Sequence, residues 1–250
     1  SDLDLVFLHG SGDLNAVTDG RRSVANDVFY ARMGQRMVHM LTTRTPSGLL
    51  YEADMRLRPN GNSGQLVASL ATFERYQLSD AWTWEHQALV RARPVAGDLG
   101  VCARFAAIRH RVLCLERDPD RLLDDVRSMR QRMRASLDRS DAGHFHVKHG
   151  TGGLVDIEFI VQYLVLRDAR KYPAVIRFSD NIRQIAALAA VGRLDVQTAA
   201  RLQEAYREFR RRLHHLSLND PSPIVGDDEL REERDFVAAV WEWHLGGQES

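Results

Sequence analysis

The spacing of hydrophobic and polar positions along this chain changes near residue 98. Before that point, residues 2–8 first alternate between polar and apolar side chains and then become wholly apolar, as in a strand that enters a core. Residues 49–58 alternate strictly between the two kinds. After it, apolar positions recur at helical spacing almost throughout. The pattern predicts an α+β architecture, with a small mixed-sheet domain over residues 1–98 and an all-helical domain over residues 99–250.

The same pattern predicts individual elements. In the first domain, Asp27 is expected to cap a helix whose apolar positions run to Leu41, and a short helix is expected at 70–78 with a strand at 87–95. In the second domain, the predicted helices cover residues 99–115, 119–138, 153–170, 179–191, 195–218 and 228–245.

Charge and cysteine content restrict the class of protein. The chain has 34 Lys+Arg and 34 Asp+Glu, and a net charge of zero argues against a general binder of nucleic acid or membrane surfaces. Cys102 and Cys114 form no paired framework, which favours a reduced cytoplasmic protein. No apolar run approaches the roughly 20 residues that cross a bilayer.

The most informative side chains are carboxylates on the two predicted strands. Asp2 and Asp4 lie on one face of the first strand, because strand side chains alternate. Two carboxylates so close repel each other unless a cation lies between them, and hard oxygen ligands suit Mg²⁺ or Mn²⁺. If the strand at 49–58 is a neighbour, Asp54 adds a third carboxylate. A solvated strand edge is the alternative for Asp2 and Asp4 alone.

Two arginines share the predicted strand face of Asp54. Arg56 and Arg58 are therefore candidates for holding phosphate oxygens, since guanidinium groups bind them in a bidentate manner. Alternatively, they neutralise Asp54 and Glu52 in a surface ladder of ion pairs. Three carboxylates that bridge two metal ions are suited to in-line displacement at phosphorus.

Four stretches of the chain resemble a known family. They are Ser-Asp-Leu-Asp at 1–4, Tyr-Glu-Ala-Asp-Met-Arg-Leu-Arg-Pro at 51–59, the Trp-rich block at 81–93 and Gly-Gly-Leu-Val-Asp-Ile-Glu-Phe at 152–159. Together they are similar to the DNA polymerase β-type nucleotidyltransferases, and among these to the bifunctional glutamine synthetase adenylyltransferase/adenylyl-removing enzymes. The resemblance runs over essentially the whole chain, and 1–4 and 82–93 look more like the adenylylating C-terminal unit.

The resemblance implies a function. Asp2, Asp4 and Asp54 would be catalytic carboxylates that bind Mg²⁺ or Mn²⁺, and AMP would pass from ATP to a tyrosine of glutamine synthetase. Glutamine and the PII signal protein would regulate the full-length enzyme in nitrogen metabolism. The related deadenylylating half, which removes AMP by phosphorolysis, is one alternative. A non-catalytic module that binds partner proteins is another.

The resemblance also bears on the start of the chain. The superfamily has a glycine-rich segment before the paired aspartates, where backbone amides meet the nucleotide phosphates, and Ser1 would adjoin it. Because the sequence has no initiator Met and opens on a strand-like segment, we expect a fragment of a longer protein. Such a fragment is expected to bind ATP weakly or to transfer AMP slowly.

A glycine-rich loop at 148–153 precedes a predicted helix. Its backbone amides are candidates for an anion site at the helix start, with Lys148 and Gly152 toward phosphate, and a plain turn between domains is the alternative. Asp156 and Glu158 cannot share one helix face at a spacing of two, so at most one of them points to a cleft.

Histidines and tryptophans offer two weaker signals. His144, His146 and His149 have a spacing that a metal can use, but no cysteine supports a zinc site. Trp82 and Trp84 can stack on a base, although burial between the domains is the expected role.

Overall fold

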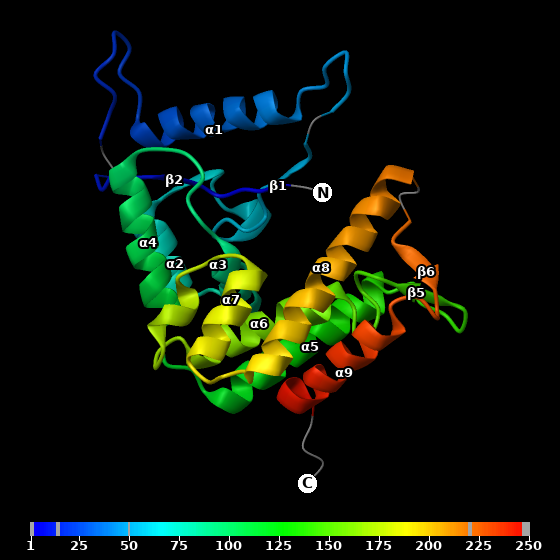
Figure 1. Ribbon diagram of the computed structural model, residues 1–250. Coiled ribbons are helices and arrows are strands. Elements are labelled where there is room, and N and C mark those ends of the chain that lie inside the picture. Colours follow the sequence, from blue (N-terminus) through cyan, green and yellow to red (C-terminus); the bar gives the residue numbers. More distant parts are fainter. Residues whose placement is uncertain (1–2, 14–15, 50, 220–221, 247–250) are drawn as a thin grey trace. The chain divides into compact units, whose positions relative to one another are not determined.

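The computed structural model describes residues 3–13, 16–49, 51–219 and 222–246. The chain divides into an N-terminal unit of residues 1–88 and 93–112, and a C-terminal unit of residues 89–92 and 113–250 (Figure 1). Residues 93–112, which include helix α4 (Leu99–Leu113) except its last residue, cluster with the N-terminal unit, and residues 89–92 cluster with the C-terminal unit. The predicted domain boundary at residue 98 stays a prediction. The helix contacts the N-terminal unit, because the rings of Phe105 and Phe73 lie 5.9 Å apart and Arg104 donates a 3.2 Å hydrogen bond to the Gly10 carbonyl.

Four short strands of the N-terminal unit form two parallel pairs. Strand β1 (Leu3–Asp4) pairs with β3 (Ala53–Asp54), and β2 (Phe7–His9) pairs with β4 (Val67–Ser69). One extended stretch, residues 3–9, therefore contacts two later segments in turn. The predicted strand at 2–8 corresponds to β1 and the first part of β2, and its first residue lies outside the described part of the chain.

The predicted strand at 49–58 was too long. Only Ala53–Asp54 has strand pairing, and the chain turns from Met55 onward. Arg58 stabilises this turn, because its guanidinium donates to the Met55 carbonyl at 2.7 Å and its backbone N–H donates to the same oxygen at 3.4 Å. Local bonds of this kind compete with strand pairing.

The helices of the N-terminal unit correct two further predictions. Helix α1 (Asn26–Thr42) begins after Ala25, so Asp27 lies in its first turn and is not the cap. The predicted strand at 87–95 is wrong, because residues Thr83–Arg91 form helix α3. Glu85 stabilises the start of α3, since its carboxylate accepts the Trp82 backbone N–H at 2.9 Å.

Helix α2 (Leu70–Ser79) is close to its prediction at 70–78. Ser69 caps it, because its hydroxyl accepts the Thr72 N–H at 3.0 Å. Leu70 and Phe73 are almost fully buried and join the helix to the core of the N-terminal unit. A short 3₁₀ helix, η1 (Gly61–Ser63), precedes β4.

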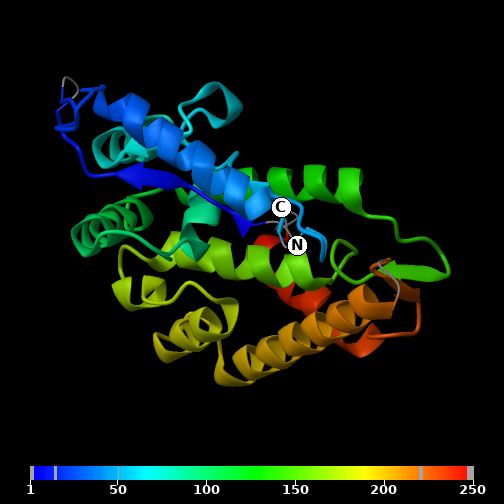
Figure 2. The same ribbon diagram turned by 90° about the horizontal axis from the view of Figure 1, so that it is seen from above.

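The C-terminal unit is built around one buried helix. Every residue of α6 (Leu154–Asp168) except Glu158 and Arg167 is buried, which marks a helix at the centre of a core. Figures 1 and 2 show α6 surrounded by its neighbours, and all of them pack against it. These neighbours are α5 (Pro119–Leu137), α7 (Asn181–Ala190), α8 (Val196–Asn219) and α9 (Arg231–Leu245).

These five helices agree with their predicted ranges to within three residues at each end. The antiparallel pair of β5 (His144–His146) and β6 (Ile224–Gly226) was not predicted, nor was the 3₁₀ helix η2 (Pro173–Ile176). An α+β unit followed by a helical unit confirms the predicted fold class.

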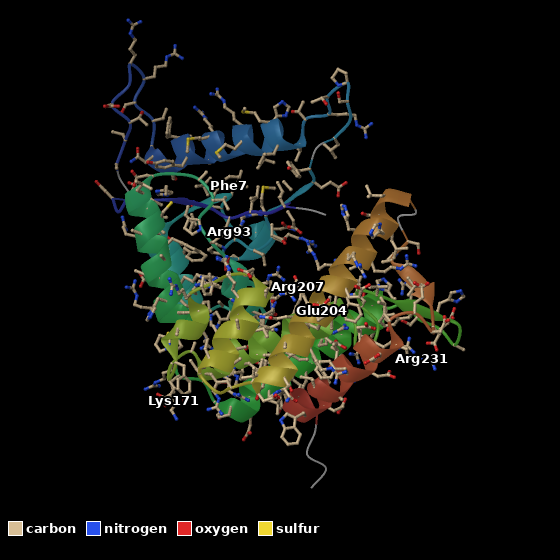
Figure 3. All side chains as sticks on the ribbon, in the orientation of Figure 1. Phe7, Arg93, Lys171, Glu204, Arg207 and Arg231 are labelled. Carbon is tan, nitrogen blue, oxygen red and sulfur yellow. The ribbon has the colours of Figure 1, made fainter. Side chains whose placement is uncertain are left out.

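The outer surface of the C-terminal unit carries ion pairs along its helices. Glu204 and Arg207, labelled in Figure 3, pair at 3.2 Å on successive turns of α8. Arg231, at the start of α9 and also labelled there, pairs with Asp227 at 2.6 Å. Exposed pairs of this kind contribute little to stability. In the part of the chain that the structure describes, no helix has the length and apolar character needed to cross a membrane.

Candidate functional site

Strand pairing brings two of the three predicted carboxylates together. Asp4 lies directly opposite Asp54 in the parallel register of β1 and β3. Backbone hydrogen bonds fix this register on both sides, from Leu3 N–H to the Glu52 carbonyl at 2.7 Å and from Leu5 N–H to the Asp54 carbonyl at 2.8 Å. Paired residues on neighbouring strands project to the same face. The expected neighbourhood of these two strands is therefore confirmed.

The third carboxylate, Asp2, and the predicted nucleotide contact Ser1 lie outside the described residues. Among the residues that the structure does describe, no three His, Cys, Asp or Glu side chains lie close enough to hold a metal ion. Two carboxylates in register nevertheless have the hard oxygen donors that Mg²⁺ and Mn²⁺ prefer. The donor type thus fits a divalent cation, and the metal-binding roles of Asp2, Asp4 and Asp54 stay predictions.

Asp54 is held by the arginine two residues later. Its Oδ1 accepts the Arg56 backbone N–H at 2.8 Å, its Oδ2 accepts Arg56 Nε at 2.7 Å, and Arg56 Nη2 also contacts Oδ2. The side-chain hydrogen bond from Arg56 holds the pKa of Asp54 below its usual value. Asp54 is therefore ionised at neutral pH, the state in which a carboxylate binds cations.

A pocket of about 330 Å³ opens beside Asp54 and Arg56, and Asp4 is not among its lining residues. Its size is in the range of small-ligand sites. It is lined by Glu52, Ala53, Asp54, Met55, Arg56, Arg58 and Asn62. Asp54 and both predicted phosphate-binding arginines thus face one space. Arg56 has a side chain that is 72% exposed, whereas Arg58 Nη1 is engaged with the Met55 carbonyl at 2.7 Å.

The glycine-rich loop at 148–153 lies in the C-terminal unit and uses its amides internally. Gly152 N–H donates to the Asp156 carboxylate at 2.7 Å, Leu154 N–H to the Val147 carbonyl at 3.0 Å and Val155 N–H to the Lys148 carbonyl at 3.1 Å. These bonds give the loop a structural role. Lys148 is exposed, and the predicted phosphate contacts of Lys148 and Gly152 stay predictions.

Backbone packing explains why a glycine stands at position 152. Its φ is +75°, and a Cβ atom there would lie 2.0 Å from the Arg234 carbonyl oxygen. Any side chain would therefore both strain the backbone and clash with the start of α9.

The prediction that Asp156 and Glu158 point in different directions is confirmed. Asp156 is fully buried against α5, where Arg130 Nε donates to it at 2.5 Å and Arg134 Nη2 at 3.0 Å. Glu158 instead accepts Arg91 Nη1 at 2.5 Å. Sequence reasoning missed all three arginine partners. The only available signal was the carboxylate in the first turn of an otherwise apolar helix.

The histidines of the 144–149 segment contact their own loop. His144 Nδ1 lies 2.8 Å from Asp141, and His146 Nδ1 accepts the His149 N–H at 3.0 Å. Burial lowers the pKa of His149 to about 4, so its imidazole is neutral at physiological pH. Trp82 is 71% exposed and Trp84 is half-buried, and their expected burial between the domains stays a prediction.

Two family models match the chain. Residues 1–108 match the glutamate-ammonia ligase adenylyltransferase family, and residues 127–222 match the GlnD PII-uridylyltransferase family. The first match contains the paired strands β1 and β3. The second lies within the helical C-terminal unit.

Individual relatives match over nearly the whole chain. A protein of Hahella chejuensis is 51% identical over 248 residues, which are 97% of this chain and 26% of the relative. A protein of Thioalkalivibrio sulfidiphilus is 49% identical and one of Methylococcus capsulatus is 50% identical, each over 96% of this chain and 25% of the relative. All three are named bifunctional glutamine synthetase adenylyltransferase/adenylyl-removing enzyme. The chain thus spans about a quarter of their length.

Proposed function

Because the chain belongs to the glutamate-ammonia ligase adenylyltransferase family, we propose that it transfers AMP from ATP to a tyrosine of glutamine synthetase. The single observation that best supports this is the register of β1 and β3, which sets Asp4 opposite Asp54, and Asp54 lines a pocket of about 330 Å³. Pyrophosphate is the second product, since the α-phosphorus is attacked in line with its bond to the leaving group.

In this proposal, Asp2, Asp4 and Asp54 hold two Mg²⁺ or Mn²⁺ ions. When bound, these ions activate the attacking tyrosine oxygen and neutralise the leaving pyrophosphate. The residues of the chain supply the binding site: the strand register keeps Asp4 and Asp54 on one face, and the lowered pKa of Asp54 keeps that carboxylate charged. Fixed geometry of this kind reduces the reorganisation that the reaction requires.

The nucleotide is proposed to contact the same pocket. Arg56 reaches Asp54 from the solvent side and is 72% exposed, so its guanidinium is placed to exchange the carboxylate for a phosphate oxygen. Arg58 donates from Nη1 to the Met55 carbonyl at 2.7 Å, and from Nη2 and Nε to the Asn62 and Gly64 carbonyls at 3.4 Å each. It is proposed to hold a second phosphate oxygen with the second N–H of Nη1 or Nη2. Ser1, Lys148 and Gly152 are proposed as further nucleotide contacts.

The acceptor is proposed to be a protein in the cytoplasm. The relatives are named for glutamine synthetase, and the second matching family is named for uridylyl transfer to PII, so both names describe nucleotidyl transfer to a protein. Glutamine and PII are proposed to regulate the full-length enzyme, which would adjust nitrogen assimilation. We propose no nucleic-acid or membrane partner, since the chain has zero net charge.

The test is incorporation of labelled AMP. Purified chain, unmodified glutamine synthetase, MgCl₂ and ATP labelled in the α-phosphate should yield labelled glutamine synthetase. Asp54→Asn should reduce the initial rate by about 100-fold or more, since even the partners that merely orient metal ligands cost about 10–100-fold when lost. Asp19→Asn removes an exposed carboxylate from a loop of the same unit and should leave the rate unchanged.

A second reaction mixture tests the related deadenylylating activity, because the relatives are also named adenylyl-removing enzymes. It contains AMP-modified glutamine synthetase and inorganic phosphate, and it is assayed for ADP. Label transfer from ATP without ADP release supports the adenylylating assignment, and the reverse supports the other half. Equal rates for Asp54→Asn and the unmodified chain would contradict both.

A further inference from the structure

A second pocket, of about 430 Å³, lies in the C-terminal unit between helices α5 and α9. Arg127, Arg130 and Arg134 line it from α5, and Trp241 and Leu245 line it from α9. The three arginines follow a spacing of three and four residues, which places them on one face of the helix. The family comparison and the proposed reaction assign no role to this pocket.

The arginines of this wall have few hydrogen-bonded counter-charges. Arg130 and Arg134 both bind Asp156, at 2.5 Å and 3.0 Å, so two guanidinium groups share one carboxylate. The Asp138 carboxylate attracts the same two arginines without a hydrogen bond to either side chain in the described part of the chain. The side chain of Arg127 makes no hydrogen bond or ion pair with any residue that the structure describes. The guanidinium of Arg127 is therefore available to an added anion.

Two nitrogen atoms of this wall also lack hydrogen-bond acceptors. Arg130 Nη1 and Arg134 Nε are buried and have no partner among the described residues. The side chain of Arg130 is only 1% exposed, and burial lowers its pKa. A buried donor without an acceptor is costly, and so is a buried charge without a full counter-charge. An anion in the adjacent pocket reduces the second cost even without touching Arg130, because Coulomb attraction acts through the low-dielectric interior.

The two acidic residues of the lining stand at the solvent side. Asp124 on α5 and Glu242 on α9 are both exposed, so water and salt screen their charges. The lining thus combines three arginines, of which Arg130 is buried, with two exposed carboxylates. This charge distribution favours a small anion over a long polyanion, since a polyanion would extend onto the exposed carboxylates and be repelled by them.

We propose that this pocket binds the carboxylate or phosphate group of a small molecule. Arg127 and Arg134, which are partly exposed, donate hydrogen bonds to the anion, and Arg130 supplies a buried positive charge behind them. Trp241 and Leu245 contact the apolar part of the ligand. The site does not depend on the proposed transfer reaction, and it is tested by binding alone.

Isothermal titration of the chain with inorganic phosphate, and separately with succinate, tests the site. At least one anion should bind with saturation at one site per chain, and the tighter of the two identifies the chemical group. Arg127→Gln should weaken this binding by about five- to tenfold, which corresponds to the loss of about 1 kcal/mol. Arg132→Gln is the matched control, because Arg132 lies exposed on the same helix and does not line the pocket.

Two outcomes would overturn the proposal. One is the absence of saturable binding of either anion up to about 10 mM, a concentration at which even weak specific sites fill. The other is equal weakening by Arg127→Gln and Arg132→Gln, which would indicate general attraction to a basic helix. Circular dichroism of both variants verifies that they are folded, and half-buried Arg127 has no hydrogen-bond or ion-pair partner among the described residues whose loss would unfold the chain.

Discussion

Asp54 in the N-terminal unit and Asp156 in the C-terminal unit have similar bonds but opposite surroundings. Each accepts a backbone N–H, at 2.8 Å from Arg56 and at 2.7 Å from Gly152, and each binds arginine. The side chain of Asp156 is 1% exposed, however, whereas that of Asp54 is 17% exposed and its partner Arg56 is 72% exposed. The chemistry of the pair alone therefore does not decide the role of the carboxylate, and its access to solvent does.

This difference follows from the elements that carry the two residues. Asp156 stands on a helix packed on all sides, so no external ligand can reach it without unfolding the core. Asp54 ends a two-residue strand and lines a pocket together with Arg56. The first pair lies inside a core, and the second lies beside a pocket.

The largest expected effect is the loss of stability on removing the buried charge. Asp156→Asn keeps the shape of the side chain but leaves Arg130 and Arg134 without a counter-charge. We expect the free energy of unfolding to fall by about 3–5 kcal/mol, the cost of breaking a buried ion pair from one side. Urea denaturation followed by circular dichroism measures it. Arg134→Gln, which retains the bond between Arg130 and Asp156, should cost much less.

A smaller effect is expected at the glycine that donates to Asp156. Gly152→Ala combines a φ of +75° with a Cβ atom placed 2.0 Å from the Arg234 carbonyl, so we expect a loss of at least about 2–3 kcal/mol. Gly192→Ala is the matched control, since φ there is +69° and nothing lies within 4 Å of the added Cβ. It should cost about 1 kcal/mol.

The difference between these two alanine variants measures the backbone contact of the loop with α9. Equal unfolding energies would show that the loop can move away from Arg234. In that case the surroundings of Asp156 would not be rigid. The contrast between buried Asp156 and Asp54 beside its pocket would then no longer hold.

The two units also differ in how far the sequence predicted them. The helices of the C-terminal unit were predicted because long amphipathic segments repeat one signal over many residues. The strand at 49–58 was overestimated, because its alternation continues through residues that instead turn, held by the guanidinium of Arg58. A short strand forms few pairing hydrogen bonds, so local bonds of this kind are not easily outweighed.

The site predictions differ in the same way. The facing positions of Asp4 and Asp54 follow from strand alternation once the two strands pair. The partners of Asp156 could not be predicted, because Arg130 lies 26 residues earlier on another helix. Only the packing of α5 against α6 brings them together, and a single sequence carries no direct signal for that contact.

The smallest expected effect is on stability at half-buried Asp54. Asp54→Asn should change the free energy of unfolding by less than about 1 kcal/mol, because water screens the pair with Arg56. Since the pKa of Asp54 is lowered in the folded state, its contribution is present above the unfolded pKa of about 4 and is lost as the pH falls through the lower folded value. The unfolding energies of wild type and variant, measured by urea denaturation at pH 7 and near pH 2, should therefore converge in acid. A loss of unfolding free energy at pH 7 as large as that of Asp156→Asn would show that Asp54 stabilises the fold in the same way as Asp156. Asp54 would then be unable to release Arg56 in order to bind a ligand in the pocket.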